Sequence, residues 1–248
     1  MKIYVINLRR LKRVMGFVLV LALSVAFTLG VLFVTDTYAY PAISGAVNKY
    51  GAEIKTVILD PGHGGEDCGA IGADGAYEKD LNLAVALEMK SILEERGYTV
   101  VMTRTEDRML YSESENIKGM RKLSDLKNRC KLAAEYENAV FISIHMNSFG
   151  DSRYSGLQVY YADGSDESRA LAQAVQSSVK SDVQPENNRV IKNGKNLYLL
   201  DNCTHTAVIV ECGFLSNTEE CKKLSEKEYQ NRLSLAIVCG IIEYIGSK

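Results

Sequence analysis

Two histidines and two glutamates stand where predicted strands end or where the next helix begins: His63, Glu78, His145 and Glu211. In α/β folds, ligands and catalytic groups collect in the loops at the carboxyl ends of the strands. Two histidines and one carboxylate form the ligand set of a hydrolytic zinc site, which keeps a fourth position open for water. A nearby carboxylate that does not bind the metal can take up a proton and pass it to a leaving amine. The pattern therefore predicts one zinc ion at His63, Glu78 and His145, amide hydrolysis, and Glu211 as the base.

Each of these side chains also has an ordinary structural explanation. His63 lies in a glycine-rich turn, and His145 could be a hydrogen-bonded core histidine. Glu78 could be a carboxylate that the helix dipole favours at a helix N-terminus. The third histidine, His205, is expected in a surface loop. Taken singly, the residues leave both explanations open, and the metal site depends on their being brought together.

The elements that must position these residues alternate between strands and helices. Leu81, Val85, Met89 and Ile92 recur at helical spacing, which predicts an amphipathic helix over 78–96. By the same approach, strands are expected at 55–60, 99–103, 140–144, 156–160 and 207–211, and further helices at 124–136, 166–181 and 226–245. The alternation predicts a single three-layer α/β domain, with a largely parallel or mixed central sheet that helices cover on both faces.

Composition and charge exclude several function classes. The 248 residues are 46% hydrophobic and 24% charged, as in a folded globular protein. The first 39 residues hold five basic residues and one acidic residue, which leaves 24 basic and 30 acidic residues, a net charge of −6, for the remainder. Because sequence-independent binding to nucleic acid depends on basic surface, we expect no nucleic-acid partner.

The six cysteines contain no C-x-x-C pair, which disfavours a zinc ribbon and a thioredoxin-type site. We expect mostly free thiols, with Cys130 and Cys239 as small core residues. Cys68 and Cys212 flank the predicted site and could be soft metal ligands. However, a strand over 207–211 would point Cys212 away from the side that Glu211 faces.

The N-terminus has the pattern of a membrane address. Residues 14–34 carry no charge and follow a basic cluster at 9–13. This uncharged segment is long enough to cross a bilayer as a helix. We favour an uncleaved signal anchor over secretion after cleavage behind Ala39. The basic cluster then stays in the cytoplasm and the rest of the chain lies outside it. The expected parts are a cytoplasmic stub and anchor (1–36), a linker (37–53) and a catalytic domain (54–248).

Five ordered segments carry a resemblance to a known family: Ile58-Leu-Asp-Pro-Gly-His-Gly-Gly65, Glu78-Lys-Asp-Leu-Asn-Leu83, Thr103-Arg104 with Asp107, Phe141-Ile-Ser-Ile-His-Met-Asn-Ser148, and Val210-Glu-Cys-Gly-Phe-Leu-Ser-Asn217. They resemble the zinc-dependent N-acetylmuramoyl-L-alanine amidases of the amidase 3 family. The resemblance implies zinc ligands at His63, Glu78 and His145 and the catalytic glutamate at Glu211. The implied substrate is peptidoglycan, cut at the amide between the lactyl group of N-acetylmuramic acid and L-alanine.

Within this family, the chain is most similar to the CwlD type of endospore formers. The features are the N-terminal anchor, the single catalytic domain, and the segments Arg121-Lys-Leu-Ser-Asp-Leu-Lys-Asn-Arg129 and Tyr198-Leu-Leu-Asp-Asn202. This type is implied to remove stem peptides from spore cortex, as a step toward muramic-δ-lactam and germination. The segment between Tyr161 and Ala207 is too short for the autoinhibitory helix of Gram-negative cell-division amidases. Control is then left to expression, localisation or a partner, for which an activating lipoprotein is a candidate.

Two arginines are candidates for the carboxylates of the substrate, Arg104 and Arg129, although both could instead be structural ion-pair partners. Two rival functions also stay open. One is a catalytically silent peptidoglycan-binding or scaffold protein with the same fold, and the other is a zinc peptidase or deacetylase with a different scissile bond. Zinc content separates the first rival from an amidase, and product identity separates the second.

Overall fold

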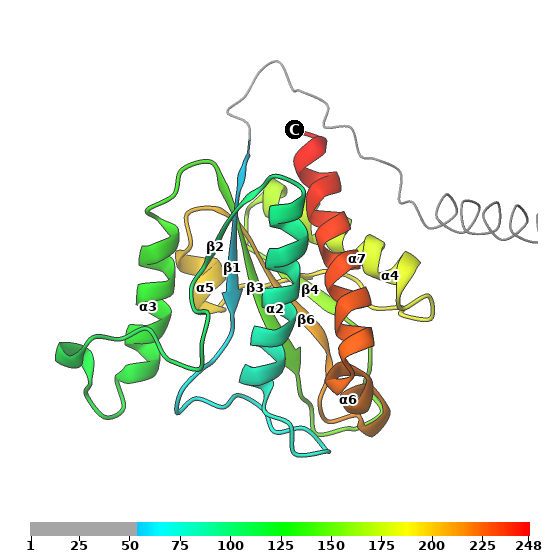
Figure 1. The fold of residues 1–248 in the computed structure, drawn as a ribbon, viewed down its shortest axis with the longest axis horizontal. Helices are drawn as coiled ribbons and strands as arrows, with labels where there is room; N and C mark the ends of the chain where they lie inside the picture. The colour runs from blue at the N-terminus through cyan, green and yellow to red at the C-terminus, as the bar shows by residue number, and fades with distance from the viewer. Residues whose placement is uncertain (1–53) are drawn as a thin grey trace, which may run out of the picture. The chain divides into compact units, whose positions relative to one another are not determined.

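The computed structural model describes residues 54–248, and the predicted anchor and linker lie outside the described residues. Six strands form one sheet in the order β2-β1-β3-β6-β4-β5 (Figure 1). The strands are β1 (Thr56–Pro61), β2 (Thr99–Met102), β3 (Ala139–Asn147), β4 (Gln158–Tyr161), β5 (Lys192–Asn193) and β6 (Thr206–Phe214). All neighbours are parallel except β4 and β6, which are antiparallel. The sheet is therefore mixed, within the range that the sequence predicted.

Helices cover both faces of the sheet and complete a three-layer α/β domain (Figure 1). The helices are α2 (Glu78–Glu95), α3 (Arg121–Ala133), α4 (Asp166–Asp182), α5 (Tyr198–Asn202), α6 (Thr218–Ser225) and α7 (Lys227–Gly246), with a short 3-10 helix, η1 (Glu113–Glu115). The apolar residues of α2, α4 and α7 pack on one face, and those of α3 and α5 on the other. None of the helices between residues 54 and 248 has the length and apolar composition that a membrane span needs.

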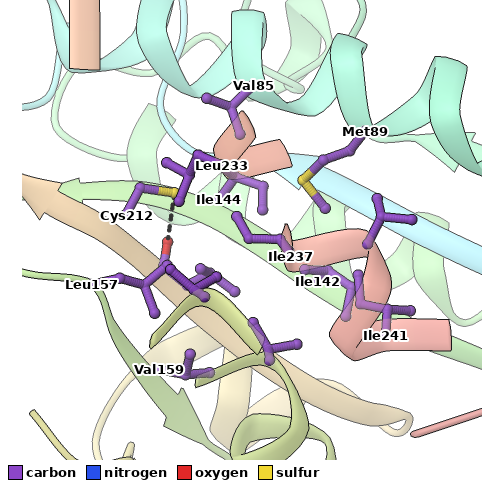
Figure 2. Packing of buried hydrophobic residues seen from close by; sticks show 14 of the residues in the cluster. Val85, Met89, Ile142, Ile144, Leu157, Val159, Cys212, Leu233, Ile237 and Ile241 are labelled. Carbon is purple, nitrogen blue, oxygen red and sulfur yellow. Dashed lines mark hydrogen bonds between the residues drawn. The ribbon is translucent and has the colours of Figure 1, made fainter. Parts of the chain in front are cut away.

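The larger core lies between the sheet and α2, α4 and α7 (Figure 2). Alternate strand residues enter it, such as Ile142 and Ile144 of β3, because successive side chains of a strand point to opposite faces. From α7, Leu233, Ile237 and Ile241 reach the same core at four-residue spacing. The intervening strand residues fill the smaller core on the other face, so the central strands are apolar throughout.

The predicted elements are present, with shifted ends. The helix expected over 124–136 spans Arg121–Ala133, and the strand expected over 207–211 extends to Thr206–Phe214. The structure adds four short elements that the sequence analysis did not include: η1, β5, α5 and α6. An element of two to eight residues shows too few periods of its hydrophobic pattern to be recognised.

Candidate functional site

The candidate site lies at the carboxyl ends of β1, β3 and β6. His145 of β3 pairs in register with Glu211 of β6, so the two residues are neighbours on adjacent strands. Pro61 at the end of β1 pairs with Ile144, and the ladder continues with a hydrogen bond from Gly62 N to Ile144 O of 2.9 Å. His63 follows directly, which places it at the same edge as His145.

Glu78, the first residue of α2, brings the two histidines together. Its Oε1 lies 3.1 Å from His63 Nε2 and 2.9 Å from His145 Nδ1. The two imidazole rings meet edge to face, with centroids 5.0 Å apart. One ligand atom from each of the three residues lies within 4.8 Å of the others. The structure thus gathers the three residues predicted as zinc ligands into a group that could hold one metal ion.

A second layer of contacts fixes this group. Glu78 Oε2 accepts a hydrogen bond from Ala70 N at 2.8 Å, and Oε1 accepts from Asn82 Nδ2 at 3.3 Å and Met146 N at 3.2 Å. On the other side, His63 Nδ1 lies 2.9 Å from Asp67 Oδ2. A carboxylate in that position sets the orientation of an imidazole whose other nitrogen faces a metal.

Asp67 and Asn82 are absent from the sequence-based set of site residues. Asp67 stands four residues after His63 in the same glycine-rich loop, and Asn82 stands one helical turn after Glu78. These spacings were the available signals, but neither spacing is specific without the loop conformation.

The loop after β1 packs too closely on His145 for any side chain at position 62. A Cβ atom on Gly62 would lie 2.2 Å from the His145 ring. His63 itself has a φ of 62°, in the left-handed region that a non-glycine residue adopts only at a cost. The tight approach brings His63 onto the ring of His145.

The charges in the group act strongly on one another. Burial alone would lower the pKa of His63, but Asp67 and Glu78 outweigh it and raise the pKa to about 9. Burial alone would raise the pKa of Glu78, but His145 and His63 outweigh it and lower the pKa. Glu78 is therefore ionised at neutral pH, which is the form that a metal ligand requires.

Glu211 has a different environment from Glu78. Its Oε2 is buried and, among the described residues, has no hydrogen-bond partner. Burial raises the pKa of Glu211 to about 7, with a further increase from Glu78 and a decrease from His145. Two glutamates at one site therefore differ in protonation, which is the usual sign of different chemical roles. The unpartnered oxygen of Glu211 also fits a site that takes a further polar group.

Arg104 and Arg129 are both 1% exposed and turn toward the protein, not toward the site opening. Arg104 donates to the carbonyls of Pro61 and Gly62 at 2.9 Å. Arg129 donates to Asp60 Oδ1 at 2.6 Å and to the carbonyl of His63 at 2.7 Å. These contacts match the structural alternative, in which both guanidinium groups hold the loop that carries His63.

The remaining candidates lie apart from the group. Cys212 is buried in the larger core, on the face opposite Glu211, as a strand requires (Figure 2). Each of the six cysteines is free, with Cys130 in α3 and Cys239 in α7. His205 Nε2 lies 2.6 Å from the carbonyl of Tyr136, near the amino-terminal end of β6 and so at the edge away from Glu211.

A three-layer α/β domain with two histidines and two glutamates at the carboxyl edge of its strands is typical of a hydrolytic enzyme with a metal site. Comparison with known protein families supports this class of enzyme. The family model described as N-acetylmuramoyl-L-alanine amidase, Amidase_3, matches residues 57–243. The chain belongs to this family, and it is an N-acetylmuramoyl-L-alanine amidase.

Individual relatives agree with this assignment. The germination-specific N-acetylmuramoyl-L-alanine amidase of Bacillus subtilis (strain 168) is 36% identical over 194 residues, which cover 78% of this chain and 81% of the relative. Among solved structures, the CwlD amidase from Clostridioides difficile, in complex with the GerS lipoprotein, has a TM-score of 0.75 and 39% identity. That match covers 78% of this chain and 100% of the other.

The catalytic domain of CwlV, an N-acetylmuramoyl-L-alanine amidase from Bacillus (Paenibacillus) polymyxa var. colistinus, has a TM-score of 0.65 and 36% identity. The match covers 78% of this chain and 99% of that domain. The similarity thus spans the whole described domain. The likeness to cell-wall amidases also implies action outside the cytoplasm.

Proposed function

We propose that this amidase is zinc-dependent and cuts the bond between N-acetylmuramic acid and L-alanine in spore cortex peptidoglycan. The observation that carries the proposal is the convergence of His63, Glu78 and His145 within 4.8 Å of one another, beside the buried Glu211. Two imidazoles and one carboxylate are the ligand set of hydrolytic zinc enzymes. The free thiols Cys68 and Cys212 are not part of this group.

In this proposal His63, Glu78 and His145 hold the metal and Glu211 is the catalytic base. A zinc ion at such a site supplies Lewis acidity and an activated water. Asp67 Oδ2 lies 2.9 Å from Nδ1 of His63, while Nε2 of the same ring faces the ligand group. The backbone donors at Ala70 and Met146 hold the Glu78 carboxylate in place.

Glu211 moves the proton. Its pKa of about 7, which burial raises, lets it exchange a proton near neutral pH. Because β6 is adjacent to β3, Glu211 lies beside His145 without sharing its hydrogen bond to Glu78. The ionised carboxylate accepts a proton from the attacking water and then donates it to the amine of L-alanine as the bond breaks.

Product analysis tests the reaction. We would incubate purified full chain with peptidoglycan, with added zinc and with a chelator in parallel, and identify the products by mass spectrometry. Free stem peptides that begin at L-alanine and appear only with zinc support the proposal. Cleavage at another bond supports the peptidase or deacetylase alternative. Peptidoglycan that is bound but intact, by a protein without zinc, supports the scaffold alternative.

The biological setting rests on similarity to the germination-specific enzyme of Bacillus subtilis and to CwlD. In that setting the chain removes stem peptides as a step toward muramic-δ-lactam, which marks the cortex for germination. Deleting the gene should abolish muramic-δ-lactam in purified spore cortex, and wild-type protein should restore it. An E211Q protein that restored it equally well would contradict the assigned role of Glu211.

The anchor and the partner complete the proposal. Residues 1–36 hold the enzyme at the membrane, residues 37–53 link the anchor to the catalytic domain, and residues 54–248 work outside the cytoplasm. Because the CwlD structure contains a lipoprotein, a lipoprotein in the same compartment is the candidate activator. Cell fractionation with sequencing of the mature N-terminus tests the anchor, and co-purification from sporulating cells tests the partner.

A further inference from the structure

Arg189 lies on a group of aromatic rings beside the candidate site, in which Phe214 is buried and Tyr154 and Phe149 are exposed. Its guanidinium carbon lies 4.3 Å from the centroid of the Phe214 ring and 5.5 Å from that of Tyr154. The Tyr154 ring stacks on Phe214 and meets Phe149 edge to face. Phe149 and Tyr154 are 59% and 45% exposed. A half-buried cation thus lies on the buried ring of Phe214, next to two aromatic rings that are open to solvent.

Strand register places this arginine on the same face of the sheet as Glu211. Gln158 of β4 pairs directly with Glu211, so the two side chains share a face. Gln158 Oε1 accepts a hydrogen bond from Arg189 Nη1 at 3.0 Å, which draws the guanidinium to that face.

A bulge in β6 brings the Phe214 ring to this face as well. Glu211 pairs with His145, but Phe214 pairs with Asn147, so three steps along β6 match two along β3. The extra residue shifts the alternation by one and turns Phe214 to the side of Glu211. Tyr160 of β4 lies close to both charged groups. Burial raises the pKa of Tyr160, the charge of Glu211 raises it further, and the charge of Arg189 lowers it.

Arg189 is held in place by hydrogen bonds but, in the part of the chain that the structure describes, by no ion pair. Its Nε donates to Ser155 O at 2.7 Å, and its backbone N donates to Asn187 Oδ1 at 2.9 Å. Within residues 54–248, no carboxylate forms an ion pair with it, and its three other guanidinium N–H groups have no hydrogen bond. The nearby acid, Glu220, instead accepts from the backbone N of Gly156 and Phe214.

We infer that Arg189 binds a carboxylate of the stem peptide and so selects acidic peptides for cleavage; this inference rests on the proposed function. A guanidinium presents paired N–H donors that match a carboxylate, and its partial burial strengthens a charge-assisted bond. The backbone and Gln158 contacts fix the guanidinium before the substrate arrives, which lowers the entropy cost of binding. The aromatic rings give the peptide a surface to lie on.

Two muramoyl peptides that differ only in charge provide the test, one with free stem carboxylates and one with these carboxylates amidated. For the full-length wild-type chain with zinc, we expect kcat/KM to favour the free-carboxylate peptide. In R189Q this preference should fall roughly 10- to 100-fold, because KM for the free-carboxylate peptide rises, and R189K should give an intermediate preference. R153Q is the matched control, because Arg153 already pairs with Asp151 at 2.7 Å in a nearby loop. It should keep the wild-type preference.

Binding of the released stem peptide, measured by calorimetry, supplies a readout that does not need turnover. R189Q should bind the free-carboxylate peptide more weakly than wild type by a similar factor, and thermal melting checks that the variant is folded. An equal effect of R189Q on free and amidated peptides, or no effect on either, would overturn the inference. If wild type cuts neither peptide, the proposed function fails, and the binding comparison still decides the role of Arg189.

Discussion

Replacing Arg129 by methionine should lower the free energy of unfolding by about 3–5 kcal/mol, the usual cost of leaving one buried charge unpaired. Asp60 is 0% exposed and accepts hydrogen bonds from Arg129, Thr103 and Ser143, each at 2.6 Å. Without Arg129 only the two hydroxyl donors remain at Asp60, and the buried Asp125 loses its ion pair at 2.8 Å as well. The carbonyls of Pro61 and His63 also lose a donor, at roughly 1 kcal/mol or more for each carbonyl that stays buried.

Urea unfolding of the metal-free full chain measures this effect. We expect R129M and D60N each to destabilise, and the double variant to lose at least about 2 kcal/mol less than the sum, because Asp60 then carries no charge and only Asp125 lacks its ion-pair partner. R153M should stay near wild type, since Arg153 lies on the surface. Strictly additive losses, or a loss below about 1 kcal/mol for R129M, would refute the reasoning.

The same pair predicts a pH dependence. Burial alone would raise the pKa of Asp60, but Arg129 and the hydroxyl donors outweigh it and lower the pKa below its usual value of 3.8. A depressed carboxyl pKa stabilises the fold above the unfolded value, and the contribution disappears as the pH falls through the folded value. The stability difference between wild type and R129M should therefore narrow below about pH 4. If the stability difference between wild type and R129M widened in acid, the pKa of Asp60 would not be lowered in the folded protein.

Three further outcomes follow from the site. D67N should weaken zinc binding about 10- to 100-fold in a chelator competition, because His63 loses its orienting carboxylate, and unchanged affinity would remove that role. E211Q should lower turnover about 10²- to 10⁴-fold while zinc content stays the same, and lost zinc would instead make Glu211 a ligand. G62A should abolish zinc binding, since its Cβ would meet a ring atom at 2.2 Å, whereas G150A, with nothing within 4 Å, should bind normally.

The sequence predicted the layers of the fold because its long elements have clear hydrophobic periods. Strands β3 and β6 are apolar on both faces, and α7 repeats its apolar residues every four positions, so these elements were recognisable. Their ends shifted by a few residues, since caps and bulges depend on tertiary contacts. The antiparallel direction of β4 cannot be predicted from its four residues, because parallel and antiparallel strands can show the same pattern of apolar and polar residues.

The three residues of the predicted metal site were identifiable because their positions depend only on where strands and helices end. The roles of the arginines cannot be identified from the sequence, because the sequence does not show whether a guanidinium group points into the protein or toward the solvent. Arg129 lies in a helix, and its contacts with Asp60 and His63 join residues more than sixty positions apart. The surroundings of Arg189 are equally hidden in the sequence, because they depend on the bulge in β6 and on the register of β4.

The metal-binding group and the surface around Arg189 differ in their freedom to change. His63, Glu78 and His145 come from the first half of the fold, where ring contacts and buried pairs tolerate little variation. Tyr154 and Arg189 come from the loop before β4 and the segment before β5, which border the site without supporting its ligand group. Homologous enzymes could thus diverge in the stem peptides that they accept while their metal chemistry stays constant, and a change of specificity could be engineered in residues 148–156 and 187–190 alone.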